Sequence, residues 1–316
     1  MTISAIVPVF NGRELLARLL DSLDAQTLRP AELLVIDNGS TDGAPELARS
    51  RGARIIAMGH NIGFARAVNR GIREAAHPLL AILNSDVELA PDYLGALAAA
   101  QAPFATGKIL SPSGWIDGTF DLTTRGAATW RAGAGHPDAP PFDQPRDIHS
   151  PPWTAVLYRA EVFQQVGMLE EAFESYLEDV EFGLRCAAHG ITGRYLPQAR
   201  AVHVGSATLG RWHPDTVRHI ARNQLFLAAR YRSACPFWPV LVAQLLWGAV
   251  AARHGHPFAW LKGIVQGMGG AIPPADAAGF DPQLLKLSLA ANERFLRANS
   301  TDSYWRLYFL LTRGAK

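Results

Sequence analysis

Cysteine and charge are both scarce in this chain. The two cysteines, Cys186 and Cys235, cannot form a disulfide framework and lack the close spacing of a thiolate metal site, which is typical of a reducing compartment. Charged residues make up 18%, below the roughly 25% of typical soluble domains, while hydrophobic residues reach 48%. This balance excludes disorder and predicts extended apolar surface. With 30 Lys and Arg against 28 Asp and Glu, the chain lacks the basic excess of a nucleic-acid-binding protein.

Targeting and membrane-spanning segments are missing as well. Residues 1–10 have no positively charged stretch before their apolar run, so we expect no secretion signal and a cytoplasmic location. Residues 237–252 are nearly all apolar, but they include Pro239 and Gln244 and are fewer than the roughly 20 that a span requires. The 316 residues leave room for one large domain, or for one domain with a helical appendage.

Apolar runs alternate with helical periodicity in the first part of the chain. Strands are predicted at 3–9, 33–36, 54–57 and 79–83, and helices begin near 15, 44 and 64. Because the strands lack polar alternation, the pattern predicts an α/β fold with a mainly parallel sheet covered by helices on both faces. Ligands bind beyond the carboxyl ends of such strands, where Asp37, Asn61 and Asp86 would converge on one crevice.

The rest of the chain divides into an irregular and a regular part. Residues 111–152 are dense in Gly and Pro, and we expect loops and a hairpin there that cover the crevice. Regular elements then return, with a strand at 154–158, a helix from about 159, a strand near 193–196, and helices at 214–231 and 282–312.

Polar residues at the strand ends are the first candidates for chemistry. Asp86 ends a buried strand next to Asn84 and Ser85, and oxygen ligands of this kind could hold a hard cation such as Mg²⁺ or Mn²⁺. A turn that merely ends a strand has the same composition, and this alternative stays open for both Asp86 and Asp37. Phe10 could likewise be a core residue.

Five segments nevertheless occur in one order: Val7-Pro8-Val9-Phe10-Asn11, residues 36–43, Asn61-Ile62-Gly63-Phe64-Ala65, Leu83-Asn84-Ser85-Asp86 and Glu178-Asp179. That order resembles the inverting family 2 glycosyltransferases with the GT-A fold, most closely the bacterial rhamnosyltransferase-like group, over about residues 3–230. The resemblance implies a catalytic domain at 1–232, with a nucleotide-binding part at 1–110 and an acceptor part at 111–232. A helical, apolar extension would follow at 233–316.

The resemblance also implies roles for single residues. Phe10 would stack on the nucleotide base, Asp37 would bind the base edge, and Asp86 would hold a metal ion that bridges the two phosphates, with His203 completing the metal site. Asp179 would be the general base. The remaining donor-site residues implied are Pro8, Asn11, Asn61, Gly63, Asn84, Ser85 and Arg222, the last within an Arg222-Asn223 pair.

The sequence departs from the family pattern at two positions. Asn84 begins the metal motif where the family usually has an acid, which puts the need for a metal in question. Glu181 replaces the usual Asp after Glu178-Asp179-Val180, at a position that we do not assign to chemistry.

Physical chemistry supports the same reaction. Sugar transfer with inversion needs a base for the acceptor hydroxyl and a cation against the departing diphosphate. Glu178 and Asp179 are adjacent, so in a helix their side chains point about 100° apart and only one can be the base; the other would orient the acceptor or Arg185. The alternatives are an acidic first turn of a helix for this pair, a structural role for His203, and a carboxylate partner for Arg222.

We therefore expect a metal-dependent enzyme of cell-surface polysaccharide biosynthesis that moves a sugar from dTDP-rhamnose or a UDP-hexose to a glycan or lipid-linked acceptor. The alternative is a catalytically silent scaffold that binds sugar nucleotides. A dinucleotide-dependent oxidoreductase is disfavoured because Asn11-Gly12-Arg13 replaces the Gly-x-Gly-x-x-Gly turn.

Residues 237–272 combine aromatic and basic side chains. This composition suits the headgroup region of a bilayer and predicts peripheral contact with the inner face of the plasma membrane, through residues that include Trp238, Trp247 and Trp260. A helix pair packed on the catalytic domain is the alternative.

Overall fold

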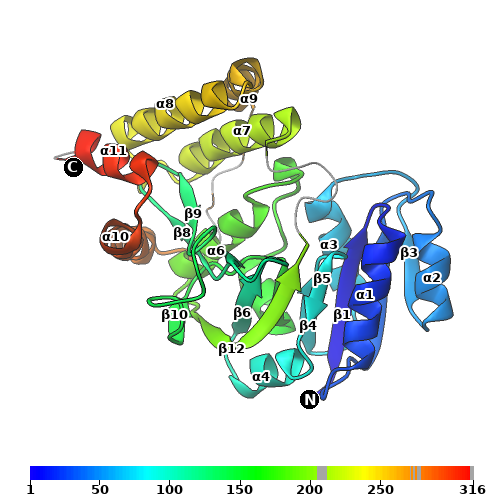
Figure 1. Ribbon diagram of the computed structural model, residues 1–316. Helices are drawn as coiled ribbons and strands as arrows, with labels where there is room; N and C mark the ends of the chain where they lie inside the picture. The colour runs from blue at the N-terminus through cyan, green and yellow to red at the C-terminus, as the bar shows by residue number, and fades with distance from the viewer. Residues whose placement is uncertain (205–211, 271, 273–274, 276–278, 314–316) are drawn as a thin grey trace.

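The structure is a computed structural model that describes residues 1–204, 212–270, 272, 275 and 279–313 (Figure 1). Within these residues a ten-stranded sheet forms the centre of the molecule. Its main path runs through β10 (Arg146–Ile148), β12 (Gly193–His203), β6 (Phe104–Leu110), β11 (Ala155–Arg159), β4 (Leu79–Leu83), β1 (Ile3–Val9), β2 (Glu32–Asp37) and β3 (Arg54–Ala57). Two short strands extend it, with β5 (Val87–Leu89) on β12 and β7 (Ile116–Gly118) on β6.

The sheet is mixed. Strands β3, β2, β1 and β4 are parallel to one another, and β6 is parallel to β12. Strand β11 lies antiparallel between these two blocks. The four predicted N-terminal strands are confirmed, and their parallel alignment brings their carboxyl ends to one edge, as a shared crevice requires.

Helices cover both faces because the strands alternate their side chains. On β1, Ile3, Ala5 and Val7 pack with α1 (Arg13–Asp24), α2 (Ala44–Ser50) and α4 (Tyr93–Ala99). Ile6 of the same strand points to the other face and packs with α3 (Phe64–Glu74), α5 (Ala160–Val166) and α6 (Glu178–Ala188). The expected α/β architecture is thus present, with α4, β5 and β6 added between 87 and 110, where no element was predicted.

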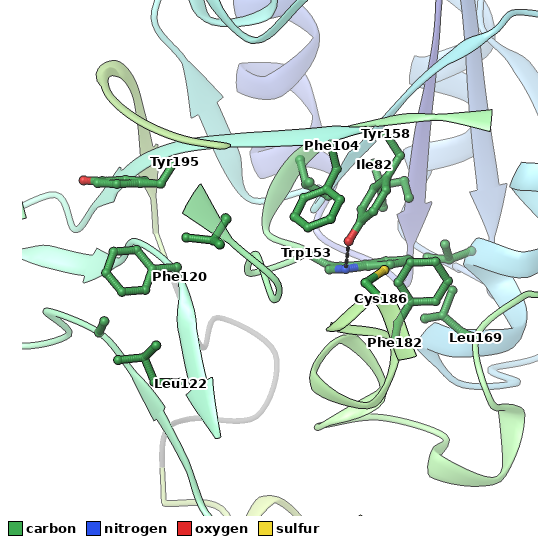
Figure 2. Close-up of a cluster of buried hydrophobic side chains, with 14 of the residues drawn as sticks. Ile82, Phe104, Phe120, Leu122, Trp153, Tyr158, Leu169, Phe182, Cys186 and Tyr195 are labelled. Carbon is green, nitrogen blue, oxygen red and sulfur yellow. Dashed lines mark hydrogen bonds between the residues drawn. The ribbon is translucent and has the colours of Figure 1, made fainter. Parts of the chain in front are cut away.

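An aromatic cluster fixes α6 on the sheet (Figure 2). The ring of Phe182 lies 5.3 Å from Trp153 and 5.1 Å from Phe163, centroid to centroid. Trp153 Nε1 donates to the hydroxyl of Tyr158 at 3.2 Å, as the dashed line shows. Gly183 permits this approach, since a Cβ there would lie 2.5 Å from Ser150. The first turn of α6 is therefore held rigidly above the sheet.

The irregular middle of the chain contains the predicted hairpin, formed by β8 (Asp121–Thr123) and β9 (Thr129–Arg131). C-terminal helices hold its turn: Arg125 donates to Glu293 of α10 (Pro282–Asn299), and Gly126 N donates to Tyr308 Oη of α11 (Ser303–Leu311) at 2.9 Å. Strands β7 and β10 lie in the same stretch, and three residues each was too short for the sequence pattern to reveal them.

The remaining helices α7 (Pro214–Arg230), α8 (Phe237–Arg253) and α9 (Pro257–Gly269) lie side by side (Figure 1). Val242 of α8 and Trp305 of α11 belong to the same buried cluster as Phe120, next to the hairpin. The helical extension predicted from 233 thus shares a core with the preceding part, and the boundary at 232 stays a prediction.

Among the described residues, no helix has the length and apolarity to cross a membrane. Cys186 and Cys235 are buried, unpaired thiols, as expected.

Candidate active site

The loops after β1 and β2 are tied together at the carboxyl edge of the sheet. Asn11 N donates to Ser40 Oγ at 2.9 Å, and Thr41 N donates to Asn11 Oδ1 at 3.0 Å. Asp37 is buried at the end of β2, where its Oδ1 accepts from Ser40 N. Pro8 is buried in β1, but Phe10 is 38% exposed. The alternative that Phe10 is a core residue is therefore wrong, and its ring is free to meet a planar ligand.

The loop after β3 contacts the segment that leads into α6. Asn61 is exposed, and its Oδ1 accepts from Gly63 N at 3.0 Å. Gly63 has a φ of 87°, and a Cβ there would lie 3.0 Å from the carbonyl oxygen of Glu174. Ala65 N donates to that same oxygen at 3.2 Å. The predicted donor segment and the predicted catalytic pair are thus neighbours.

Asp86 and His203 meet as the sequence predicted. Pairing of β12 with β5 sets His203 opposite Val87, and the imidazole Nε2 lies 3.1 Å from Asp86 Oδ1. Its Nδ1 lies 2.9 Å from Asp117 Oδ2, on β7. Burial acts to lower the pKa of His203, but the two carboxylates outweigh it and raise this pKa to about 9. The half-buried Asn84 and Ser85 precede Asp86 on the loop after β4.

This arrangement fits a divalent cation that also binds the ligand. A carboxylate oxygen and an imidazole nitrogen are the two donors that converge, through Asp86 and His203. Throughout the described ranges, no three His, Cys, Asp or Glu side chains gather to hold an ion. A cation at this point would therefore complete its coordination with phosphate oxygens and water. Asp117, on the far nitrogen of the imidazole, is placed to fix which nitrogen faces the ion.

Glu178 and Asp179 begin α6, and an arginine from the covering hairpin reaches them. Arg131 Nη2 donates to Asp179 Oδ2 at 3.1 Å. The same guanidinium makes two bonds to Asp121, at 3.1 and 3.0 Å, from the position directly opposite on the hairpin. The sequence analysis did not predict Arg131, Asp121 or Asp117, because all three lie in the irregular stretch at 111–152.

The two acids of this pair have different protonation chemistry. Burial, followed by the charge of Asp121, raises the pKa of Asp179 to about 6, although Arg131 opposes the shift. Burial and the neighbouring Asp179 raise the pKa of Glu178 well above its usual range. Glu178 Oε2 is buried and has no hydrogen-bond partner among the described residues. Asp179 is therefore suited to accept a proton near neutral pH, whereas Glu178 holds its proton to a higher pH than an ordinary glutamate does.

Arg185 and Arg222 both contact other protein groups in this structure. Arg185 donates to Glu181, which is fully buried on the next turn of α6, so neither Glu178 nor Asp179 orients Arg185. Arg222 is buried, donates to the carbonyl of Phe173 at 2.9 Å, and lies 3.3 Å from Glu174. The carboxylate pairing considered for Arg222 is thus present, and its contact with a diphosphate stays a prediction.

Comparison with known proteins agrees with these features. A model of the family described as Glycosyl transferase family 2 matches residues 4–167. The N-acetylglucosaminyl-diphospho-decaprenol L-rhamnosyltransferase of Mycobacterium tuberculosis is 30% identical, with 75% of this chain and 87% of that protein covered. The O-antigen biosynthesis protein RfbC of Myxococcus xanthus is 33% identical, with 65% of this chain and 17% of that protein covered.

Two solved structures share the fold at low sequence identity. The mannosyltransferase PcManGT from Pyrobaculum calidifontis, in complex with GDP-Man and Mn²⁺, has a TM-score of 0.53 at 16% identity, covering 99% of this chain and 87% of that one. GalNAc-T7 with UDP, GalNAc and Mn²⁺ has a TM-score of 0.60 at 14% identity, covering 85% and 57%. Both have the sheet and helix arrangement described above.

Proposed function

Because this chain belongs to glycosyltransferase family 2, in its rhamnosyltransferase-like group, we propose that it transfers a sugar with inversion from a nucleoside-diphosphate sugar to an acceptor hydroxyl. The observation that carries this proposal is the placement of Asp179. Its carboxylate is buried, burial and Asp121 raise its pKa to about 6, and the turn just before α6 contacts the predicted donor segment at Ala65. A carboxylate in this state is suited to general-base catalysis near neutral pH.

The proposed reaction is a single displacement. Asp179 takes the proton from the acceptor hydroxyl while that oxygen bonds to the anomeric carbon. The bond from this carbon to the diphosphate breaks, and its electron pair leaves with the diphosphate. Arg131 holds Asp179 Oδ2, which restricts the orientation of the carboxylate during the transfer.

We propose Mg²⁺ or Mn²⁺ as the cofactor, held by Asp86 and His203. When bound, such an ion supplies positive charge against the departing diphosphate. The donor set of this chain supports the proposal, and the PcManGT and GalNAc-T7 structures both contain Mn²⁺. Asn84, which stands where the family usually has an acid, leaves Asp86 as the carboxylate of this motif.

The relatives support a choice of donor and acceptor class. The decaprenol-linked rhamnosyltransferase supports a rhamnosyl donor, for which we propose dTDP-rhamnose, and a lipid-linked acceptor. Validoxylamine A glucosyltransferase of Streptomyces hygroscopicus subsp. limoneus is 30% identical, with 75% of this chain and 59% of that protein covered, and it supports a hexosyl donor, for which we propose a UDP-hexose as the second choice. Release of nucleoside diphosphate, measured for a panel of nucleotide sugars with wild type and Asp179→Asn, tests the proposal. A wild-type protein that binds one of them without turnover would instead be a silent scaffold.

We also propose peripheral contact with the inner face of the plasma membrane, which would bring a lipid-linked acceptor to the crevice. Apolar side chains at helical spacing along α9 face outward, with Phe258 83% and Met268 78% exposed. From 216 to 275 the sequence has no Asp or Glu, and Arg253 and Lys262 are exposed, which suits anionic headgroups.

The residues that would meet lipid agree only in part with those expected, because Phe237 and Trp238 are 78% and 49% exposed whereas Trp247 and Trp260 pack inward. Trp260 packs against Gly248 of α8, and the indole nitrogens of Trp247 and Trp260 are both buried. These two rings therefore lie within the helix layer. Trp247 and Trp260 thus pack as the alternative of a helix pair on the catalytic domain expects. The membrane proposal rests on the outward side chains of Phe237, Phe258 and Met268.

A further inference from the structure

A short turn before α6 has an unusual backbone. Glu174, Tyr176 and Leu177 have φ values of 61°, 70° and 67°, in the left-handed region that side chains other than glycine rarely adopt. The turn follows a 3₁₀ helix at Glu171–Phe173, and Glu178 comes directly after it. Such a conformation persists only where the surroundings hold it, and it is found most often at functional sites.

Asn223, fully buried in α7, holds this turn from one side. Its Nδ2 donates to three backbone carbonyls, those of Phe173 at 3.0 Å, Ser175 at 3.1 Å and Tyr176 at 2.6 Å. One amide group thus gathers the acceptors of nearly the whole turn. Replacing it would take this donor from the carbonyls of Ser175 and Tyr176, whereas the carbonyl of Phe173 would keep its bond from Arg222. The loss favours rearrangement of the turn.

Arg222 completes the contact and orients the amide. Its Nε donates to Asn223 Oδ1 at 2.9 Å, which fixes the direction in which Nδ2 points. Its Nη2 donates to the carbonyl of Phe173 at 2.9 Å, and its Nη1 lies 3.3 Å from the Glu174 carboxylate. A planar guanidinium can make these contacts together, whereas the single ammonium of a lysine cannot.

The other side of the turn contacts the predicted donor segment. The carbonyl of Glu174 accepts from Ala65 N, at the start of α3, and Gly63 lies against the same oxygen. Two residues after the turn comes Asp179, whose Oδ1 accepts from Val180 N. One strained turn therefore connects the loop after β3 with the proposed base.

We propose that Arg222 and Asn223 are positioning residues, which hold the turn at 173–177 so that Asp179 is set at the correct place relative to the donor. This inference rests on the proposed function for the role of Asp179. In this role Arg222 acts by bonding to the protein backbone. The alternative is direct contact of Arg222 with the diphosphate, and the test below distinguishes the two. Misplacing a reacting group by about 1 Å can cost about 10²-fold in rate.

The test compares two variants with a matched control. Asn223→Ala removes the amide, and Arg222→Lys keeps the charge but not the planar donors. Gln244→Ala is the control, because this buried amide also bonds to α7, at the carbonyl of Ala221, and does not touch the turn. We expect both variants to lower kcat by about 10²-fold with donor KM within about twofold. The control should keep kcat and KM even if its Tm falls.

Two outcomes would overturn the proposal. One is an Asn223→Ala variant with wild-type kcat. The other is an Arg222→Lys variant that weakens the binding of nucleoside diphosphate while Asn223→Ala does not, since Arg222 would then act on the diphosphate.

A second measurement is independent of turnover. Amide hydrogen exchange over residues 173–180 in the substrate-free protein should be faster in Asn223→Ala and Arg222→Lys than in wild type, and unchanged in Gln244→Ala. If the wild type transfers no sugar, the proposed function fails, while the exchange data still decide whether these residues hold the turn. Unchanged exchange in both variants would refute the positioning role in either case.

Discussion

Arg131 donates to Asp179 at 3.1 Å, and the two residues come from parts of the chain that are far apart in sequence. Asp179 lies in the first turn of α6, whereas Arg131 ends the second strand of the hairpin. The same guanidinium is bound by Asp121, so the proposed base shares its counterion with a second carboxylate. This sharing limits how far Arg131 can stabilise the ionised form of Asp179, and it leaves the base with a pKa of about 6.

Asp179→Asn should reduce kcat by about 10²–10⁴-fold, because only the proton acceptor is removed. Donor affinity, measured by calorimetry, should stay within a few-fold of wild type. Glu178→Gln is the matched comparison, since burial and Asp179 raise the pKa of Glu178 and favour its protonated form. If Glu178→Gln were inactive and Asp179→Asn active, the base would have been assigned to the wrong acid.

The rate should depend on pH through Asp179. A base must be ionised, so a pKa raised to about 6 means that kcat falls as the pH drops through 6, by about tenfold per unit below it. Asp121→Asn removes a negative neighbour that raises this pKa. We therefore expect the acidic limb of the kcat profile to move to lower pH in Asp121→Asn. A limb at the same pH in both proteins would refute the coupling.

Glu178→Gln should also change stability in a pH-dependent way. The folded state holds the Glu178 proton more firmly than the unfolded chain does, so the stability of wild type declines as pH rises above the unfolded pKa of about 4.3. The neutral amide of Glu178→Gln does not lose stability in this way as the pH rises. The difference between the Tm of this variant and that of wild type should therefore rise by a few degrees between pH 4 and pH 8. Glu88→Gln, which removes a partly exposed acid paired with Arg18, is the control variant.

Metal removal should weaken donor binding. Asp86→Ala, and EDTA treatment of wild type, should both reduce affinity for the nucleotide sugar, because a cation held by Asp86 and His203 would offset the repulsion between this carboxylate and the phosphates. Asp117→Asn should weaken Mn²⁺ binding by about 10–100-fold, followed by electron paramagnetic resonance in the presence of nucleoside diphosphate. Asp147→Asn, at an exposed acid paired with Arg194, is the control. Full activity after dialysis against EDTA would refute the metal proposal.

Binding to anionic vesicles should depend on the outward face of α9. Wild type should sediment with such vesicles at low salt and less at high salt, where charges are screened. The double variant Phe258→Ser/Met268→Ser should bind the vesicles at least about tenfold more weakly than wild type, because it loses apolar surface that lipid would cover. Leu287→Ser removes an exposed apolar side chain from α10 and should bind as wild type does. A wild type that stays in the supernatant at low salt would contradict membrane contact.

The part of the site that sequence could predict lies at the ends of regular elements. Asp86 follows a buried strand, which the apolar run predicts, and Glu178-Asp179 was found through the order of five segments that resembles the family. Asp117, Asp121 and Arg131 belong to strands of three residues, which have no period to detect. Their positions depend on long-range pairing. Trp247 and Trp260 show the same limit, since composition predicted aromatic rings in this region but not which side of the helix layer they face.

The bonds from the C-terminal helices to the hairpin have a consequence for shortened forms of this protein. Glu293 and Tyr308 hold the hairpin turn at Arg125 and Gly126. The two strands that this turn joins carry Asp121 and Arg131 at the end away from the turn. A fragment that stops before α10 would keep every residue assigned to donor, metal and base. It would still lose the bonds from Glu293 and Tyr308 to the hairpin that places Arg131 beside Asp179. Low activity in such a fragment would therefore be no argument against those assignments.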